Sequence, residues 1–222
     1  MELVEYPDRE MQAIALADRL ASALRNCLLV HDRASFCVPG GSTPGETFAL
    51  LAQADLDWSR VHVFLGDERW VPEDHPRSNT KLLRETLLTG RAAAATLVPM
   101  MNDAPTPEEG ASRLAPGLDG ELPISLLLLG MGGDGHTASL FPGEAATEAA
   151  LADDAPRLMG VHPEGQEPRI TLTAPVLKGA METHVLIAGS DKRAVVERAR
   201  GMDPLDAPIA AFLKDAEVHW AP

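Results

Sequence analysis

The sequence predicts an α/β protein with a doubly wound, mostly parallel sheet and helices on both of its faces. Two observations support this fold class. Short apolar runs end in glycine-rich or charged loops, and segments with apolar residues at helical spacing follow several of these runs. In such sheets ligands bind beyond the carboxyl ends of the strands, so the loops after the strands are the place to look for a site.

Apolar stretches and helical periodicity place the elements in alternation along the chain. Residues 8–26 carry an apolar stripe at helical spacing and predict a surface helix. The predicted strands cover residues 35–38, 61–65, 125–129, 157–161, 169–173 and 184–188. Further helices are expected at residues 44–53, 78–88 and 191–200.

Length and composition favour one folding unit. The chain has 222 residues, which is within the size of about 250 residues that a single core commonly reaches. There is no internal repeat and no serine- or glycine-rich linker. We therefore expect one domain over residues 1–222, with a core filled mainly by aliphatic side chains because aromatic residues make up only 4%.

The acidic balance limits the classes of partner. A formal net charge of −14 argues against binding to nucleic acid or to an anionic membrane surface, since both need a basic face. An anionic ligand would need a local basic pocket. The two cysteines, Cys27 and Cys37, are expected to be free thiols in a reducing compartment, and no targeting or membrane-spanning segment is evident, which together predict a cytoplasmic protein.

The first candidate loop, residues 40–44 (GGSTP), follows a predicted strand. Its glycines allow close approach of a ligand to the backbone, and Thr43 with Glu46 fits a capping box at the start of a helix. Free amides around Gly41 and Ser42 could hold a phosphate, although a plain strand-to-helix turn explains the same residues equally well. The loop lacks the Gly-Lys-Ser/Thr ending of a Walker A motif.

The second candidate loop, residues 66–72 (GDERWVP), places two carboxylates and a guanidinium directly after a strand. Taken alone, Asp67, Glu68 and Arg69 could equally be solvated surface charges. Their position at the carboxyl end of a predicted strand favours a role in a site.

The third candidate loop, residues 130–137 (GMGGDGHT), is the most informative. It follows a fully apolar strand and presents Asp134 and His136 among glycines, which permit tight turns and remove side-chain bulk. Because histidine can exchange protons near neutral pH, His136 is interpreted as a catalytic base rather than a structural side chain.

The same loop formally satisfies the dinucleotide-binding pattern G-x-G-x-x-G, with an acidic residue at Asp153 or Asp154 near the expected spacing. This alternative is disfavoured because residues 141–143 (FPG) interrupt the helix that the pattern requires, and no second strand follows promptly.

Two later cations complete the candidate set. Arg169 begins a predicted strand, and Lys192 begins a helix just beyond another strand. Each would be a surface charge if it stood alone. The other histidines, His184 among them, show no metal-ligand spacing, so no metal site is predicted.

Four motifs, in this order, resemble those of the 6-phosphogluconolactonase family. They are GGSTP at residues 40–44, GDERWVP at residues 66–72 with Ser78 and Asn79, GMGGDGHTASLFP at residues 130–142 and RITLT at residues 169–173. The long glycine–histidine motif is the most specific of them. One departure is Pro39, which stands where many members carry serine, so a contact from that hydroxyl is absent here.

The resemblance implies a modified Rossmann-like fold shared with glucosamine-6-phosphate deaminases. It also implies hydrolysis of 6-phospho-D-glucono-1,5-lactone to 6-phosphogluconate in the oxidative pentose phosphate pathway, without a cofactor or a metal. The expected partner is a small anionic sugar phosphate, with neither nucleic acid nor membrane, and the expected assembly is a monomer or small homo-oligomer.

The same resemblance assigns roles to individual residues. His136 would act as the base on the attacking water, and Asp134 would orient His136. The expected substrate- and phosphate-binding residues are Gly41, Ser42, Thr43, Asp67, Arg69, Arg169 and Lys192.

Two other functions remain open at this point. An amino-sugar phosphate isomerase or deaminase could use the same scaffold, but in that family a glutamate completes a proton relay where this sequence has Phe141. A sugar-phosphate sensor that binds without turnover would differ only in the absence of acid release from fresh lactone.

Overall fold

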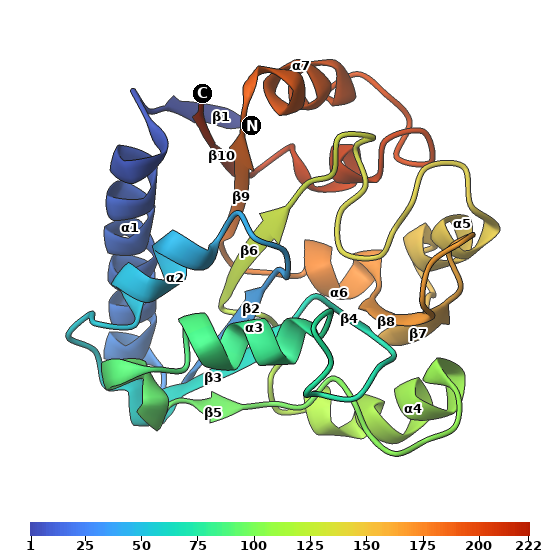
Figure 1. The fold of residues 1–222 in the computed structure, drawn as a ribbon, viewed down its shortest axis with the longest axis horizontal. Coiled ribbons are helices and arrows are strands. Elements are labelled where there is room, and N and C mark those ends of the chain that lie inside the picture. Colours follow the sequence, from blue (N-terminus) through green and yellow to red (C-terminus); the bar gives the residue numbers. More distant parts are fainter.

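The computed structural model describes residues 1–222 and is built around a seven-stranded sheet (Figure 1). In spatial order its strands are β1 (Glu2–Glu5), β10 (Glu217–Ala221), β9 (Thr183–Ala188), β6 (Leu126–Gly130), β2 (Ala34–Val38), β3 (Val61–Leu65) and β5 (Thr96–Leu97). Every neighbouring pair in this sheet is parallel. The carboxyl ends of its strands therefore meet along one edge.

Helices cover both faces of the large sheet, which confirms the predicted fold class (Figure 1). The helices α1 (Arg9–Val30), α2 (Gly45–Leu51) and α3 (Asn79–Thr86) pack against one another on one side. The other helices are α4 (Pro107–Leu114), α5 (Ala145–Leu151), α6 (Ala174–Lys178) and α7 (Ser190–Ala199), with short 3₁₀ turns at Trp58–Arg60, Gly90–Ala94, Ala115–Leu118 and Pro208–Phe212.

A second, small sheet lies outside the mostly parallel sheet that the sequence predicts. It consists of β4 (Asp67–Arg69), β8 (Arg169–Leu172) and β7 (Leu158–Val161), and both of its pairings are antiparallel. The strands predicted at residues 157–161 and 169–173 therefore exist, but they lie outside the parallel sheet. In the register of β4 with β8, Arg69 lies directly opposite Arg169.

The core consists mainly of leucine, valine and alanine side chains from α1 and the central strands, as the low aromatic content predicts. All five residues of β2 are buried, as expected for a strand with neighbours on both edges and layers on both faces. Both cysteines are free thiols, as predicted. No helix is long and apolar enough to cross a membrane.

The first turns of α1 and α2 differ in whether a side chain caps the helix. The Asp8 carboxylate accepts a hydrogen bond from the Met11 amide at 2.8 Å and caps α1. The capping box predicted from Thr43 and Glu46 is wrong, because α2 begins one residue later, with Pro44 at its cap and no side-chain hydrogen bond. The Thr43 side chain is thus not engaged as a helix cap.

Candidate active site

A cleft of about 280 Å³ lies at the carboxyl ends of β2, β3, β6 and β9. Its walls come from the three loops selected in the sequence, from β4 and β8, and from the first turn of α7. The lining includes eight of the nine predicted site residues: Gly41, Ser42, Thr43, Asp67, Arg69, His136, Arg169 and Lys192. The ninth, Asp134, lies beside the cleft and contacts His136.

Asp134 and His136 form a close pair. The Asp134 Oδ1 atom lies 2.6 Å from His136 Nδ1 and also accepts the His136 backbone amide at 3.1 Å. Partial burial by itself would raise the pKa of Asp134, but the hydrogen bonds and charge of His136 outweigh that effect and lower it. An ionised carboxylate at Nδ1 holds the proton there, so Nε2 keeps a free lone pair.

The glycines of the third loop leave the space that this pair occupies. A Cβ atom on Gly132 would lie 2.1 Å from His136 Nδ1 and 2.6 Å from Asp134 Oδ1. The amide of Gly132 donates to the His136 carbonyl at 2.9 Å, which closes the loop. Gly135 has a φ of +87°, a conformation that favours glycine. No helix follows the loop until α5, so the helix required for dinucleotide binding is missing here.

Phe141 packs against both His136 and Arg169. Its ring centroid lies 4.8 Å from that of His136, and the Arg169 guanidinium carbon lies 5.3 Å from the Phe141 ring centroid. The ring thus contacts both the His136 imidazole and the Arg169 guanidinium.

Arg69 and Arg169 converge because β4 and β8 pair in antiparallel register. The Nε atoms of both side chains are buried and have no hydrogen-bond partner in the protein. Burial foremost, and then Arg69 and Arg77, lower the pKa of Arg169, whereas Asp67 opposes this effect. An anion between the guanidinium groups would relieve their mutual repulsion.

The two acidic residues of the second loop have different surroundings. The Asp67 carboxylate is buried, accepts the Ser139 hydroxyl at 2.6 Å and lies 3.5 Å from Arg169 Nη1. The Asp67 carboxylate therefore holds the Arg169 guanidinium in place at the wall of the cleft. Glu68 accepts the amides of Asn79 and Thr80 at 2.8 and 2.7 Å, so its carboxylate fixes the start of α3 instead of facing a ligand.

Lys192 extends into the cleft from the first turn of α7 and is partly buried. It forms no ion pair with a carboxylate of the protein. Burial first, and then the charge of Arg9, lower the pKa of Lys192, while Asp134 acts in the opposite direction. An unpaired ammonium in this position is available to an anionic ligand.

The structure adds positioning residues that the sequence analysis did not select. Ser139 links Asp67 to Arg169, and Gln166 Oε1 accepts Arg169 Nη2 at 2.5 Å. Ser139 falls within the third motif, three residues after His136, so its position was a usable signal. Gln166 lies in a loop with no local pattern.

Asn79 orients the other arginine of the cleft. Its Oδ1 atom accepts Arg69 Nη1 at 2.7 Å, and its Nδ2 group donates to the Asp67 carbonyl at 2.9 Å. Gly40 makes room for this side chain, because a Cβ atom there would lie 2.0 Å from Asn79 Oδ1.

The fold and the cleft together define a class: an α/β protein with a histidine–aspartate pair beside a small cleft that is lined by three cationic side chains. Residues 7–220 match the family described as glucosamine-6-phosphate isomerases/6-phosphogluconolactonase. A 6-phosphogluconolactonase of Rhizobium meliloti (strain 1021) is 41% identical over 231 residues, covering 100% of this chain and 98% of the relative. One from Pseudomonas putida is 37% identical, covering 98% and 92%.

Solved structures agree with these sequence matches. A 6-phosphogluconolactonase from Shewanella baltica OS155 superposes with a TM-score of 0.96 at 34% identity, covering 100% of this chain and 98% of the other. A monomeric glucosamine-6-phosphate deaminase shares the fold, with a TM-score of 0.81 at 18% identity. The chain belongs to the 6-phosphogluconolactonase family.

Proposed function

We propose that the chain hydrolyses 6-phospho-D-glucono-1,5-lactone to 6-phosphogluconate, the reaction for which its relatives are named. The observation that carries this proposal is the pairing of His136 with Asp134 at 2.6 Å beside a cleft lined by three cations. A lactone carbonyl is electrophilic, so its hydrolysis needs one base for water, one donor for the developing oxyanion and a grip on the substrate.

His136 acts as the base through Nε2. Asp134 keeps the proton on Nδ1 and stabilises the imidazolium that forms when Nε2 takes a proton from water. The resulting hydroxide adds to C1 of the lactone. Breakdown of the tetrahedral intermediate breaks the bond between C1 and the ring oxygen, which takes the proton from the His136 imidazolium and becomes a hydroxyl of the open-chain acid.

The first loop supplies the oxyanion donors in this proposal. In the third loop the amides of Gly132 and Gly135 donate to carbonyls of the same loop, so they are not free. The amides of Gly41 and Ser42 have no protein acceptor and border the same cleft. Backbone donors of this kind stabilise developing charge without reorganisation.

The cations Arg69, Arg169 and Lys192 hold the anionic part of the substrate. Charge-assisted hydrogen bonds contribute about 1.5 to 3 kcal/mol each, so they can fix C1 against the attacking water. Asp67, Asn79 and the first-loop residue Thr43 complete the polar wall.

The wider setting is also part of the proposal. One buried cluster with residues from α1 to β10 supports a single domain over residues 1–222. We infer a cytoplasmic enzyme of the oxidative pentose phosphate pathway that needs no cofactor, metal or nucleic acid and works as a monomer or small homo-oligomer. The net charge of −14 supports the absence of nucleic acid.

Comparison of two substrates tests the assignment. The Lys192→Ala variant should lower kcat/KM for the phosphorylated lactone by about ten- to a hundredfold and have little effect on unphosphorylated gluconolactone. Lys192 suits this test better than Arg169, whose removal would leave the buried carboxylate of Asp67 without its partner. An equal loss on both substrates would show that Lys192 does not hold the phosphate.

A deaminase reaction is excluded in this proposal because it needs a second proton-transfer group. Phe141 fills the space beside His136, and a phenyl ring carries no exchangeable proton. No ammonia should form from glucosamine 6-phosphate. Ammonia released at a rate comparable to lactone hydrolysis would overturn the lactonase assignment and direct attention to Asp67 and Glu144.

A further inference from the structure

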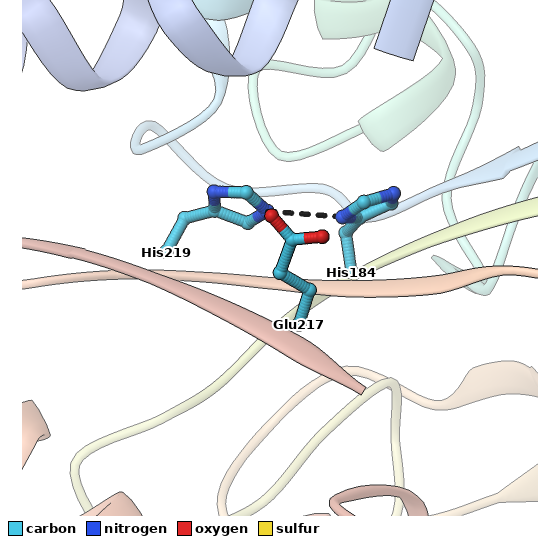
Figure 2. A group of neighbouring side chains, drawn as sticks. All are labelled: His184, Glu217 and His219. Carbon is cyan, nitrogen blue, oxygen red and sulfur yellow. Dashed lines mark hydrogen bonds and ion pairs between the residues drawn. The ribbon is translucent and has the colours of Figure 1, made fainter. Parts of the chain in front are cut away.

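A group of titratable side chains lies on β9 and β10, away from the cleft (Figure 2). His184 pairs with Glu217 across the two strands, and His219 stands two residues beyond Glu217. Since side chains alternate between the faces of a strand, all three lie on the same face of the sheet. One ligand atom from each lies within 4.8 Å of the other two.

We propose that His184, His219 and Glu217 form a binding site for a divalent transition-metal ion, with Zn²⁺ as the best-suited candidate. Two imidazoles and one carboxylate are a donor set that zinc takes, with a water molecule in the fourth position. The three donors come from two neighbouring strands, and both histidines are buried. The site lies near the amino end of β9, whereas the cleft lies at its carboxyl end.

The outer nitrogens of both histidine rings are already held as metal-bound histidines require. Glu182 Oε1 lies 2.9 Å from His184 Nε2, and the Tyr6 hydroxyl lies 2.8 Å from His219 Nδ1. Such outer contacts orient the rings and turn their inner nitrogens toward a metal. The inner atoms here are His184 Nδ1 and His219 Nε2, 2.9 Å apart (Figure 2).

The two imidazoles need only a small adjustment to accept zinc. With bonds of about 2.0–2.1 Å and a tetrahedral angle, two ligating nitrogens stand about 3.3–3.4 Å apart, so the rings must separate by a few tenths of an ångström. Because the Glu182 carboxylate accepts the proton on His184 Nε2, we infer that His184 Nδ1 accepts a hydrogen bond from His219 Nε2 when no metal is bound. When the metal binds both inner nitrogens, that proton moves to His219 Nδ1 and is donated to the Tyr6 oxygen, with no net release.

Glu217 offers one carboxylate oxygen while the other stays anchored. Its Oε2 atom accepts Arg19 Nη2 at 2.6 Å, and its Oε1 atom lies 3.8 Å from His219 Nε2. The Arg19 contact holds the carboxylate in place beside the rings.

A cavity of about 870 Å³ provides an entry path, because His184 and Glu217 both line it. Solvent in this cavity can supply the fourth ligand. The two histidines are 35 residues apart in the sequence, which is why local ligand spacing predicted no metal.

The experiment measures binding of Zn²⁺ alone to the full chain. Other histidines paired with carboxylates could bind zinc at the surface, notably His136 with Asp134 and the exposed pair of His162 with Glu108. The test therefore uses a His136→Ala/His162→Ala double variant and titrates Zn²⁺ by competition with a chelating dye. Thermal unfolding with and without Zn²⁺ gives a second readout.

We expect about one Zn²⁺ per chain to remain bound in the double variant and to raise its Tm. Adding Glu217→Gln, a partly exposed and isosteric change, should weaken zinc binding at least tenfold and abolish the rise in Tm. Co²⁺ in place of Zn²⁺ should show the visible bands of a tetrahedral site. The proposal would be overturned if the double variant bound no zinc, or if Glu217→Gln changed the affinity by less than tenfold.

Discussion

At the scale of single residues, the chemistry depends on the direction in which one imidazole faces. In the proposed mechanism, the contact between Asp134 and Nδ1 fixes the tautomer of His136, so that Nε2 can accept a proton from water. The Phe141 ring packs against that imidazole with a centroid distance of 4.8 Å.

Replacement of Asp134 by asparagine tests whether catalysis depends on the tautomer of His136. The carboxamide that the Asp134→Asn variant carries would fit the same space, but its NH₂ group could donate to Nδ1 and favour the inactive tautomer. We expect kcat to fall about 10- to 1000-fold with a smaller change in KM, measured as proton release from fresh lactone. A kcat within twofold of wild type would mean that Asp134 does not set the tautomer.

Lys192 should make ligand binding depend on pH. Because burial and Arg9 lower its pKa, the ammonium loses its charge at a lower pH than an exposed lysine, and an anionic ligand opposes this loss. Calorimetry should show that affinity for 6-phosphogluconate falls as the pH rises through the lowered pKa and that binding there takes up protons.

The Lys192→Arg variant is the matched control for that measurement. A guanidinium stays charged throughout the accessible pH range, so the alkaline loss of affinity should disappear or move upward. Identical pH profiles for wild type and Lys192→Arg would contradict the role of the ammonium.

At the scale of elements, the third loop (residues 130–137) depends on a glycine at a position where a Cβ atom would not fit. Gly132→Ala would push a methyl group into His136 and Asp134, whereas a Cβ atom on Gly133 meets nothing within 4 Å. We expect Gly132→Ala to lower kcat at least tenfold and Gly133→Ala to stay near wild type, with similar Tm values for both variants. Equal activities would show that the loop moves freely around the pair.

Local patterns predicted most of the large sheet. The strand at Val61–Leu65 was predicted with its observed bounds, because an apolar run ends at a glycine. The three loops of the site were also found from sequence, since parallel strands bring their carboxyl ends together. The strand at Glu217–Ala221 was not predicted, although it lies between two other strands.

Long-range pairing explains what the sequence could not provide. The strand at Asp67–Arg69 is short and charged, and it becomes a strand by pairing with Arg169–Leu172, which is far away in the sequence. The position of Arg69 directly opposite Arg169 depends on this register, which no local sequence pattern predicts. The same holds for the meeting of His184 with His219.

At the scale of the whole molecule, strand β9 borders two separate cavities. On β9, Leu186 borders the cleft at the carboxyl end, whereas His184 borders the larger cavity near the amino end. In the two proposals above, the parallel sheet separates an edge that binds the anionic substrate from an edge that binds a metal ion. Activity and metal binding should therefore respond to different substitutions.

The most direct test of the account is proton release on adding freshly made 6-phosphogluconolactone at constant pH, with the spontaneous rate subtracted. The wild-type chain should accelerate release well above the spontaneous rate. A folded His136→Ala variant should be slower by about 10²- to 10⁴-fold, the usual effect of a positioned acid–base group. A wild-type rate no faster than spontaneous hydrolysis, or a His136→Ala rate close to wild type, would contradict the central claim.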